Sequence, residues 1–459
     1  MYHRPLMLLS LLLLLLTPLG TYAETYWVAT NGNNGNSCGA AQSQNTPKAT
    51  ITNATGCMTG GDTLILRCGT YNQTIDDTIP NGSPAGNTIV RAETKGCAIL
   101  RPNNKSSVDG YSLVILGRTQ DRSYITLDGL VVDGSNTSQG MGGIILTVQG
   151  PFDHPPTGDI HHITVQNCEI RNLAANYQNW SDSNAFMVTG HQNTLRNNAV
   201  HDIGNNQSNN PGDDFAFPYG IYFNGDDHVI ENNEWYRIAG YTIHMFGASD
   251  TIHGNNPMFA DRNIFRNNYV HDAGTSLFCG GHSNHIYNNI FANIGRGLIG
   301  GGPSPFQGGL QIGGYCDGNS SGENQVYNNT IWHSNWQCIS LSLGGGESTS
   351  NNIIRNNICY QNDGGDGIFQ NAGGSGNVQD HNLLGPNPLF ANTGAADFHL
   401  NTGSPAINTG LIADNICTDG TPTRDGANRC QGNIDMGALE GSGTVIQPLP
   451  QPTNLRLVP

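Results

Sequence analysis

The sequence predicts an all-β fold in which short parallel strands wind into a solenoid, and three observations support this prediction. A motif of two apolar residues that flank an Asn recurs through the central region. A second short run lies between successive motifs, and each such run ends at or near Gly. Runs of this length and composition are typical of strands and argue against helices.

The recurring motif reads apolar–x–x–Asn–x–apolar. Its first positions hold Leu127, Val165, Leu195, Ile230, Phe265, Ile286, Val326 and Ile354. Its middle positions hold Leu130, Cys168, Asn198, Asn233, Asn268, Asn289, Asn329 and Asn357, and its last positions hold Val132, Ile170, Val200, Trp235, Val270, Phe291, Ile331 and Cys359. A constant motif at variable spacing indicates stacked rungs with loops inserted between them. We interpret the Asn residues as structural, because amides at one corner of successive coils can hydrogen-bond along the stack.

The intervening runs predict a second strand in each coil, and they read GIILTVQG, AFMVTG, GIYFNG, TIHMFG, SLFCG, GLQIGG, ISLSLGG and GIFQNAGG. Side chains alternate between the two faces of a strand, and we set the register on the Gly corners. One outer face then carries Met187, Tyr222, His244, Phe278 and Gln311, while Leu277 and Cys279 point inward. Adjacent rungs lie about 4.8 Å apart, so Tyr222 and His244 become neighbours. Such a line suits stacking of sugar rings, although stacked aromatic side chains also stabilise a sheet surface by themselves.

The two ends of the 459-residue chain differ from its centre. Residues 1–23 combine Arg4, an apolar run over 6–16 and the small residue Ala23, which predicts a cleaved signal peptide and a secreted protein. We assign residues 24–440 to one β domain. Residues 441–459 are rich in Gly, Ser and Pro and predict a flexible tail.

Secretion gives meaning to the 11 Cys residues. Their odd number implies that at least one has no partner within the chain. We expect two disulfides among Cys38, Cys57, Cys68 and Cys97, and one between Cys417 and Cys430. Cys359 falls at an apolar position of the repeat, so we expect a buried thiol there.

The charge balance is acidic, with 35 Asp and Glu against 19 Lys and Arg. The three Lys residues, Lys48, Lys95 and Lys105, all precede the central region. This balance argues against nucleic acid or an anionic membrane as a partner, and no stretch after the N-terminal one is apolar enough to span a bilayer. We expect a monomer whose partner is a polysaccharide.

Several segments resemble the right-handed parallel β-helix family, the pectin-lyase-like superfamily, over nearly the whole mature chain. They are PKATI (47–51), GDTLILRCGTY (61–71), NPLF (387–390), DFHL (397–400), GSPAI (403–407) and DMGALE (435–440). The resemblance implies a single-stranded β-helix of roughly eight to ten coils. The N-terminal segment would cap the stack, and the C-terminal segment would close it. It does not imply one activity, because a single fold hosts many functions.

Among the functions of this family we favour a polysaccharide lyase that acts on an acidic, uronate-containing glycan. β-Elimination needs a base for the C5 proton, and His244 has a side chain that titrates near neutral pH. Tyr222 would be its partner or the acid for the leaving group. Arg262, or Arg237, would neutralise the substrate carboxylate. The chain departs from the many β-helix lyases that use Lys or Arg as the base, because its central coils contain no Lys.

Further residues extend this candidate site. Phe278, Met187 and Gln311 on the outer face, and His282 at the following corner, would contact the substrate. Asp213, Asp214, Asp226 and Asp227 could bind Ca²⁺ through carboxylate oxygens, which would let an acidic protein hold a uronate. Asp is also favoured in turns for conformational reasons alone.

A non-catalytic surface or glycan-binding β-helix is the first alternative. It would have the same rungs without a competent site. The pairs His201-Asp202 and His271-Asp272 occupy equivalent rung positions. We therefore interpret them as decoration of the repeat, not as catalytic dyads.

An inverting glycoside hydrolase that resembles polygalacturonases is the second alternative. Such an enzyme needs carboxylates on adjacent coils. Gly212-Asp213-Asp214 resembles the Gly-x-Asp-Asp element of polygalacturonases, and Asp182 lies about one coil upstream. Their Arg-Ile-Lys element has no match, and Gly281-His282 fits their Gly-His-Gly element poorly.

Overall fold

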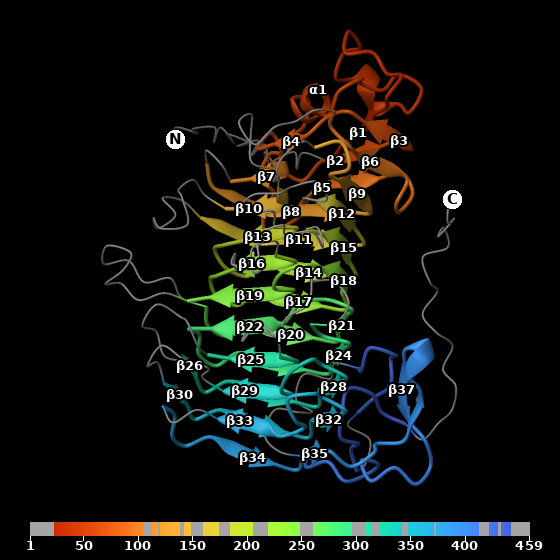
Figure 1. The fold of residues 1–459 in the computed structure, drawn as a ribbon. Coiled ribbons are helices and arrows are strands. Elements are labelled where there is room, and N and C mark those ends of the chain that lie inside the picture. Colours follow the sequence, from red (N-terminus) through yellow and green to blue (C-terminus); the bar gives the residue numbers. More distant parts are fainter. Residues whose placement is uncertain are drawn as a thin grey trace, which may run out of the picture.

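The computed structural model confirms a parallel β-helix built from three long sheets (Figure 1). It describes residues 23–103, 112–117, 120–137, 142–147, 159–173, 184–204, 219–247, 260–295, 308–313, 321–341, 348–370, 373–412, 422–429 and 433–441. From β2 (Thr63–Leu66) onward the chain passes from sheet A to sheet B to sheet C and returns to sheet A one rung further on. Crossovers between parallel strands of one sheet are right-handed in almost all proteins, as expected for this fold.

The strand bounds show how short the rungs are. Sheet A contains β1 (Thr25–Val28), β2 (Thr63–Leu66), β5 (Thr88–Ala92), β8 (Arg122–Asp128), β11 (Ile160–Gln166), β14 (Thr194–Arg196), β17 (Val229–Glu231), β20 (Ile264–Arg266), β23 (His285–Tyr287), β27 (Gln325–Tyr327), β31 (Ile353–Arg355) and β34 (Val378–Asp380). Sheet B contains β3 (Gly69–Tyr71), β6 (Ala98–Leu100), β9 (Leu130–Asp133), β12 (Glu169–Leu173), β15 (Ala199–Ile203), β18 (Glu234–Ile238), β21 (Tyr269–His271), β24 (Ile290–Ala292), β28 (Thr330–Trp332), β32 (Ile358–Tyr360) and β35 (Leu383–Leu384).

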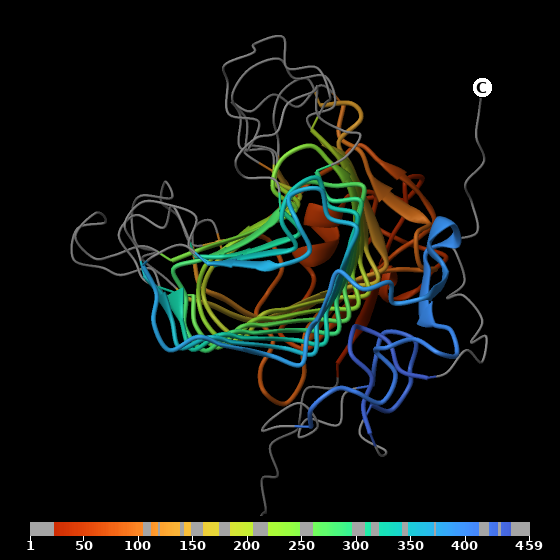
Figure 2. The same cartoon turned by 60° about the horizontal axis from the view of Figure 1, so that its bottom comes forward.

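Sheet C contains β4 (Ile75–Asp76), β7 (Ser112–Leu116), β10 (Gly142–Leu146), β13 (Phe186–Val188), β16 (Ile221–Phe223), β19 (Ile243–Phe246), β22 (Ser276–Cys279), β25 (Leu310–Ile312), β29 (Ile339–Leu341) and β33 (Ile368–Gln370). The remaining elements are η1 (Ala40–Gln42), α1 (Ile51–Thr55), β26 (Ser321–Gly322), β30 (Thr349–Ser350), β36 (Phe390–Asn392), η3 (Thr393–Ala395) and β37 (Asp397–Leu400). Figure 2, turned to bring the C-terminal coils forward, shows successive coils lying over one another.

The apolar positions of the repeat form the core as predicted. The first positions pair in one continuous register along sheet A, from Leu127 to Ile354. The last positions do the same along sheet B, from Val132 to Cys359. Trp235 is the largest of the fully buried side chains. At the N-terminal end, Ile51 and Ala54 of α1 join this core.

The predicted Asn ladder runs along the corner between sheets A and B. The backbone N and Nδ2 of Asn198 both donate to Oδ1 of Asn233, at 2.9 and 3.0 Å. The same contacts continue through Asn268, Asn289, Asn329, Asn357 and Asn382. In the Asn-Asn pairs of this ladder, the first Asn has φ between 51° and 57°, a region that Asn tolerates better than most residues. The pair therefore has two roles, one residue turning the corner and the other bonding along the stack.

A second ladder, which the sequence pattern did not reveal, runs along the corner between sheets C and A. Asn263, Asn284, Asn324, Asn352 and Asn377 are its members. Oδ1 of each later residue accepts the backbone N–H of the one before it, at 2.8–3.0 Å. From Asn263 onward, two of the three corners of the coils are thus fixed by Asn amides.

The disulfides confirm most of the Cys predictions and correct one. Cys38 pairs with Cys57, and Cys68 pairs with Cys97. The expectation of a buried thiol at Cys359 is wrong, because Cys359 forms a disulfide with Cys338 in the segment between β28 and β29. The buried free thiol among the described residues is Cys168. The predicted Cys417–Cys430 bridge, the signal peptide and nearly all of the C-terminal tail lie outside the described residues.

The described part of the C-terminal segment lies beside the stack and not over its end, which corrects the expectation from the sequence (Figure 1). β36 and β37 pair in antiparallel fashion, and Phe398, Ala438 and Leu439 pack on Ile290 and Ala292 of sheet B. In the last coil, Gln370 and Gln379 take inward-facing positions and hydrogen-bond to each other at 3.3 Å. Polar side chains thus end the apolar core in the described chain, as terminal repeats of solenoids generally require.

We predict that Asn233→Ala lowers the free energy of unfolding by about 1–3 kcal/mol for each buried group left without a partner. Asn233 is fully buried, and its Oδ1 accepts both hydrogen bonds from Asn198. Asn232→Gly is the matched control within the same pair, because Asn232 has φ 56° and Gly adopts this conformation without strain. Thermal and urea denaturation of both variants tests this prediction. Equal midpoints for the two variants would contradict the role assigned to the ladder.

We also predict a pH-dependent contribution from His399, which lies between two carboxylates. Its Nδ1 is 2.6 Å from Asp397 and its Nε2 is 2.9 Å from Asp425. The hydrogen bond to Asp425, opposed by burial and aided by Asp397, raises the pKa of His399 from 6.5 to about 9. A raised His pKa stabilises the fold fully below about pH 6.5, and this contribution disappears as the pH rises through 9.

The variant His399→Gln isolates this effect, because its side chain does not titrate. Wild type should exceed it in stability by roughly 1–3 kcal/mol at pH 6, with partial exposure of the ring reducing the value. The difference should vanish near pH 10. A difference that stays constant across this range would show that His399 contributes through packing alone.

Candidate functional site

The outer face of sheet C carries one continuous column of side chains. In register these are Ile115, Ile145, Met187, Tyr222, His244, Leu277, Gln311, Ser340 and Phe369. Tyr222 and His244 are direct neighbours, as predicted. Met187 packs with Ile115 and Ile145, and Gln311 is only 1% exposed. Four of the five residues predicted for this face are therefore on it, but Met187 and Gln311 are largely covered.

Phe278 is the fifth, and its predicted outward position is wrong. It pairs with Met245 and Ile312 of the inward column and is 2% exposed. Its ring packs edge-on against Phe265 in the core, with 5.5 Å between centroids. The strand is shifted by one residue relative to the prediction, so Ser276 and Phe278 point inward and Leu277 points outward. Both registers bury apolar side chains, but the observed one places the large ring in the interior.

Four aromatic side chains surround His244. We call His244, Tyr219, Tyr222, Tyr241 and Phe246 together the aromatic cluster. The ring centroid of His244 lies 4.8 Å from Tyr222, 5.1 Å from both Tyr219 and Tyr241, and 5.8 Å from Phe246. The Tyr222 ring meets the imidazole edge-on, while the Tyr241 ring stacks on it. Leu277 and Cys279 extend the cluster along the sheet.

The imidazole of His244 is neutral over the physiological pH range. Burial lowers its pKa from 6.5 to about 3. Its Nδ1 is buried and has no hydrogen-bond partner within the described chain. A buried polar atom without a partner is rare in proteins and costs stability. This atom is therefore the feature of the cluster that packing does not explain.

Tyr219 and Tyr241 are members of the site that the sequence reasoning missed. Each lies two residues before the first inward-facing residue of its strand, in YGIYF (219–223) and YTIHM (241–245). The repeated Tyr-x-Ile in adjacent coils was a visible signal. It was overlooked because both Tyr residues precede the strands and were not placed on the outer face.

The polar corner after sheet C forms a separate ionic network. Nε and Nη2 of Arg262 donate to both carboxylate oxygens of Asp227, at 2.9 and 3.0 Å, and Nη2 also donates to Oδ2 of Asp226 at 3.1 Å. The N–H of Asp261 donates to Oδ1 of Asp226, and the N–H of His282 donates to Oδ1 of Asp261. All four carboxylate oxygens of the Asp226/Asp227 pair are thus engaged.

This network bears on the predicted Ca²⁺ site. Ca²⁺ would have to displace Arg262 to reach the oxygens of Asp226 and Asp227. Asp213 and Asp214, the other predicted ligands, lie outside the described residues, as does Asp182. Among the residues that are described, no three His, Cys, Asp or Glu side chains are grouped to hold a metal ion. The pair as it stands does not fit Ca²⁺, and the wider prediction of a Ca²⁺ site stays a prediction.

The outer face of sheet B carries a ladder of ion pairs that connects neighbouring rungs. His201 lies 2.6 Å from Asp202 and 3.2 Å from Glu169, and His271 has the equivalent contacts with Asp272 and Glu234. Burial lowers the pKa of both His residues, but their carboxylate partners outweigh this and leave each pKa raised. Arg237 belongs to this face and binds Asp202 at 2.6 Å. These contacts fit the interpretation of the His-Asp pairs as repeat decoration.

Comparison with known proteins gives structural likenesses only. No protein-family model and no curated protein matches the sequence. The solved structures similar to this chain include pectate lyase Pel9A, at 15% identity and TM-score 0.48, covering 91% of this chain and 96% of that one. A mannuronic acid specific family 6 polysaccharide lyase from human gut microbiota matches at 15% identity and TM-score 0.43, covering 66% and 71%.

A protein described as a glycoside hydrolase matches at 12% identity and TM-score 0.46, covering 79% of this chain and 97% of that one. All three TM-scores lie below 0.5, so the assignment as a β-helix rests on the strand pairing of this chain itself. A helix of sufficient length and hydropathy to cross a membrane does not occur in the described part of the chain.

We predict that the double variant Asp226→Asn/Asp227→Asn leaves Ca²⁺ binding unchanged. Arg262 already neutralises this pair, so the wild-type carboxylates offer no free oxygen to the ion. Isothermal titration of wild type and variant with CaCl₂ provides the measurement. A Ca²⁺ affinity that is present in wild type and lost in the variant would show that the ion displaces Arg262.

Proposed function

We propose that this protein is a secreted polysaccharide lyase that binds an acidic, uronate-containing glycan along the outer face of sheet C. The observation that carries the proposal is the aromatic cluster around His244. It combines the half-buried ring of Tyr222, which can stack on a sugar, with a neutral imidazole on the adjacent rung of the same outer face.

The geometry of the cluster suits an extended polysaccharide. Tyr222 and His244 lie on adjacent rungs, and Tyr219 and Tyr241 flank them on the same rungs. The axial C–H bonds of a sugar ring present an apolar face, which the negatively polarised face of an aromatic ring attracts. Sugar units bound along this column would follow the axis of the stack.

In the proposed reaction the imidazole of His244 accepts the C5 proton of a uronate. The electrons of the C5–H bond form the C4–C5 double bond, and the C4–O bond to the neighbouring sugar breaks. The departing oxygen then takes a proton from the Tyr222 hydroxyl or from water. A pKa of about 3 makes His244 a weak base in the free protein, but a substrate carboxylate beside the ring favours the imidazolium and raises that pKa.

Neutralisation of the substrate carboxylate requires a positive charge close to the outer face of sheet C. Arg262 has a side chain that is 52% exposed, which leaves its guanidinium accessible at the corner after sheet C. Its contacts with Asp226 and Asp227 offset its charge. Ca²⁺ held by Asp213 and Asp214 would supply the missing positive charge, as the sequence predicted.

Secretion fits the disulfides of the described chain. Cys38–Cys57, Cys68–Cys97 and Cys338–Cys359 are formed, and disulfides persist mainly in oxidising compartments. Together with the predicted signal peptide, they support an extracellular site of action. We further propose that the protein acts there as a monomer.

A glycan-binding protein without catalysis is the second candidate, and the lowered pKa of His244 favours it. Packing among four aromatic side chains would by itself give an imidazole a pKa this low, without any role in catalysis. The two candidates share the same surface. They differ in whether the bound glycan is cut.

The lyase proposal predicts that residues 24–459 generate unsaturated uronate ends from one of pectate or alginate, detected by their ultraviolet absorbance. The same assay with a chelator tests the requirement for Ca²⁺. New reducing ends without this absorbance would show that the protein hydrolyses the glycan and does not cleave it by elimination. Retention on an immobilised glycan without any cleavage would instead establish the second candidate.

We further predict that His244→Ala lowers turnover by about 10²–10⁴-fold, the usual contribution of a general base, while its thermal midpoint stays close to that of wild type. Leu277→Ala is the matched control, because Leu277 occupies the next rung of the same column and has no titratable group. Equal loss of activity in both variants would mean that His244 contributes to packing and not to chemistry.

A further inference from the structure

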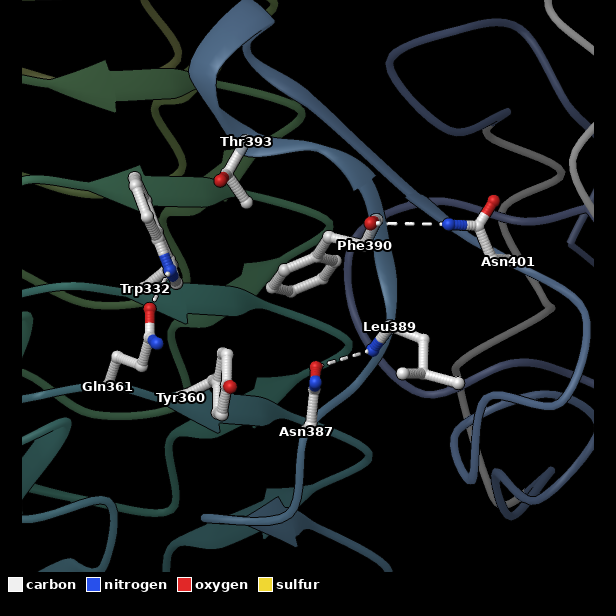
Figure 3. Close-up of a pocket in the computed structure, with 8 residues that line it drawn as sticks. All are labelled: Trp332, Tyr360, Gln361, Asn387, Leu389, Phe390, Thr393 and Asn401. Carbon is white, nitrogen blue, oxygen red and sulfur yellow. Dashed lines mark hydrogen bonds between the residues drawn. The ribbon is translucent and has the colours of Figure 1, made fainter.

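A cavity of about 350 Å³ lies between the outer face of sheet B and the C-terminal segment (Figure 3). Trp332 and Tyr360 contribute from adjacent rungs of sheet B, and Phe390 contributes from β36. In Figure 3 the Phe390 ring projects toward Trp332 and Tyr360. The volume falls within the range of about 300–1,000 Å³ that small-molecule sites occupy.

The rest of the lining is uncharged. It consists of the polar residues Gln361, Asn387, Thr393 and Asn401 and of the apolar residue Leu389. Nε1 of Trp332 donates to Oε1 of Gln361 at 3.0 Å, and Oδ1 of Asn387 accepts the N–H of Leu389 at 2.9 Å. These bonds hold the side chains in place. They leave Nε2 of Gln361, Nδ2 of Asn387 and Oγ1 of Thr393 without a partner in the described chain, available to a ligand.

The cavity wall is well anchored. Phe398 packs edge-on against both Trp332 and Phe390, with centroids 5.7 and 5.3 Å apart. Nδ2 of Asn401 donates to the carbonyl oxygen of Phe390 at 3.3 Å. The C-terminal segment is thereby fixed against sheet B, and the lining does not depend on a single contact.

We propose that this cavity is a second carbohydrate site, one that binds uncharged sugar units. Half-buried indole and phenol rings can stack on the apolar face of a pyranose, and amide and hydroxyl groups match sugar hydroxyls because both donate and accept hydrogen bonds. A carboxylate or sulfate would find no cation here, since none of the lining residues is charged. The site would hold neutral portions of a glycan.

This site is separate from the one proposed for catalysis. It lies on sheet B beside the C-terminal segment, whereas the aromatic cluster lies on sheet C (Figure 1). A protein with both sites could bind a neutral region of a polysaccharide on sheet B and cleave an acidic region on sheet C. The proposal does not depend on the lyase activity.

Affinity electrophoresis of residues 24–459 in gels that contain neutral xylan, galactan, glucan or mannan tests the proposal. We expect at least one of these polymers to retard the wild type. Trp332→Ala and Gln361→Ala should each weaken the binding at least ten-fold, and Trp332→Phe should retain part of it. Gln361→Ala leaves the contacts with Phe398 intact, so its loss of binding would not reflect unfolding of the C-terminal segment.

Tyr236→Ala is the control variant, because Tyr236 occupies the same column of sheet B outside the cavity. It should bind as the wild type does, and His244→Ala should also keep its neutral-glycan binding. No retardation of the wild type by any of the four polymers would overturn the proposal. Equal effects of Tyr236→Ala and Trp332→Ala would overturn it as well. Neither result would affect the test of elimination.

Discussion

The hydrogen bond from one buried Asn amide to the next is the interaction on which the rest of this structure depends. Parallel strands of two to seven residues hold few backbone hydrogen bonds each, and a slip of one residue would turn every core side chain outward. The ladders at two corners prevent this slip, because a shifted amide would lose its partners above and below. The register in turn determines which side chains share the outer column of sheet C.

The fold could be predicted where the polarity of each residue matches its position inside or outside the coil. The two apolar columns of sheets A and B and the ladder through Asn233 and Asn268 followed from a fixed motif, and all were confirmed. The register at Phe278 failed because Leu277, Phe278 and Cys279 are all able to lie inside, so polarity did not decide between two registers. Interior volume decided, and volume depends on neighbours in other coils.

The repeated motif also could not predict contacts between segments that are distant in the sequence. The disulfide of Cys359 with Cys338 joins a core strand to the preceding corner, and the C-terminal segment packs along sheet B by means of Phe398 and Leu439. Of the candidate site, Tyr222 and His244 were placed correctly. The cluster that encloses them, and the engagement of Asp226 and Asp227 by Arg262, required the three-dimensional structure.

The two outer faces use the same scaffold in different ways. Sheet B pairs each His with carboxylates, so its charges are satisfied within the protein, and its later rungs are covered by the C-terminal segment. Sheet C instead surrounds one imidazole with rings and leaves its Nδ1 without a partner in the described chain. An unsatisfied group of this kind lowers stability, so its presence calls for an explanation such as a role in catalysis. This difference is why we propose that sheet C carries the function.

The most direct test of this account is a crystal structure of the His244→Ala variant with an acidic oligosaccharide that it cannot cleave. The account predicts a sugar ring stacked on Tyr222, with a uronate C5 facing the space left by the imidazole. An oligosaccharide bound at the corner of Asp226 and Arg262, or on sheet B, with the aromatic cluster empty, would contradict it.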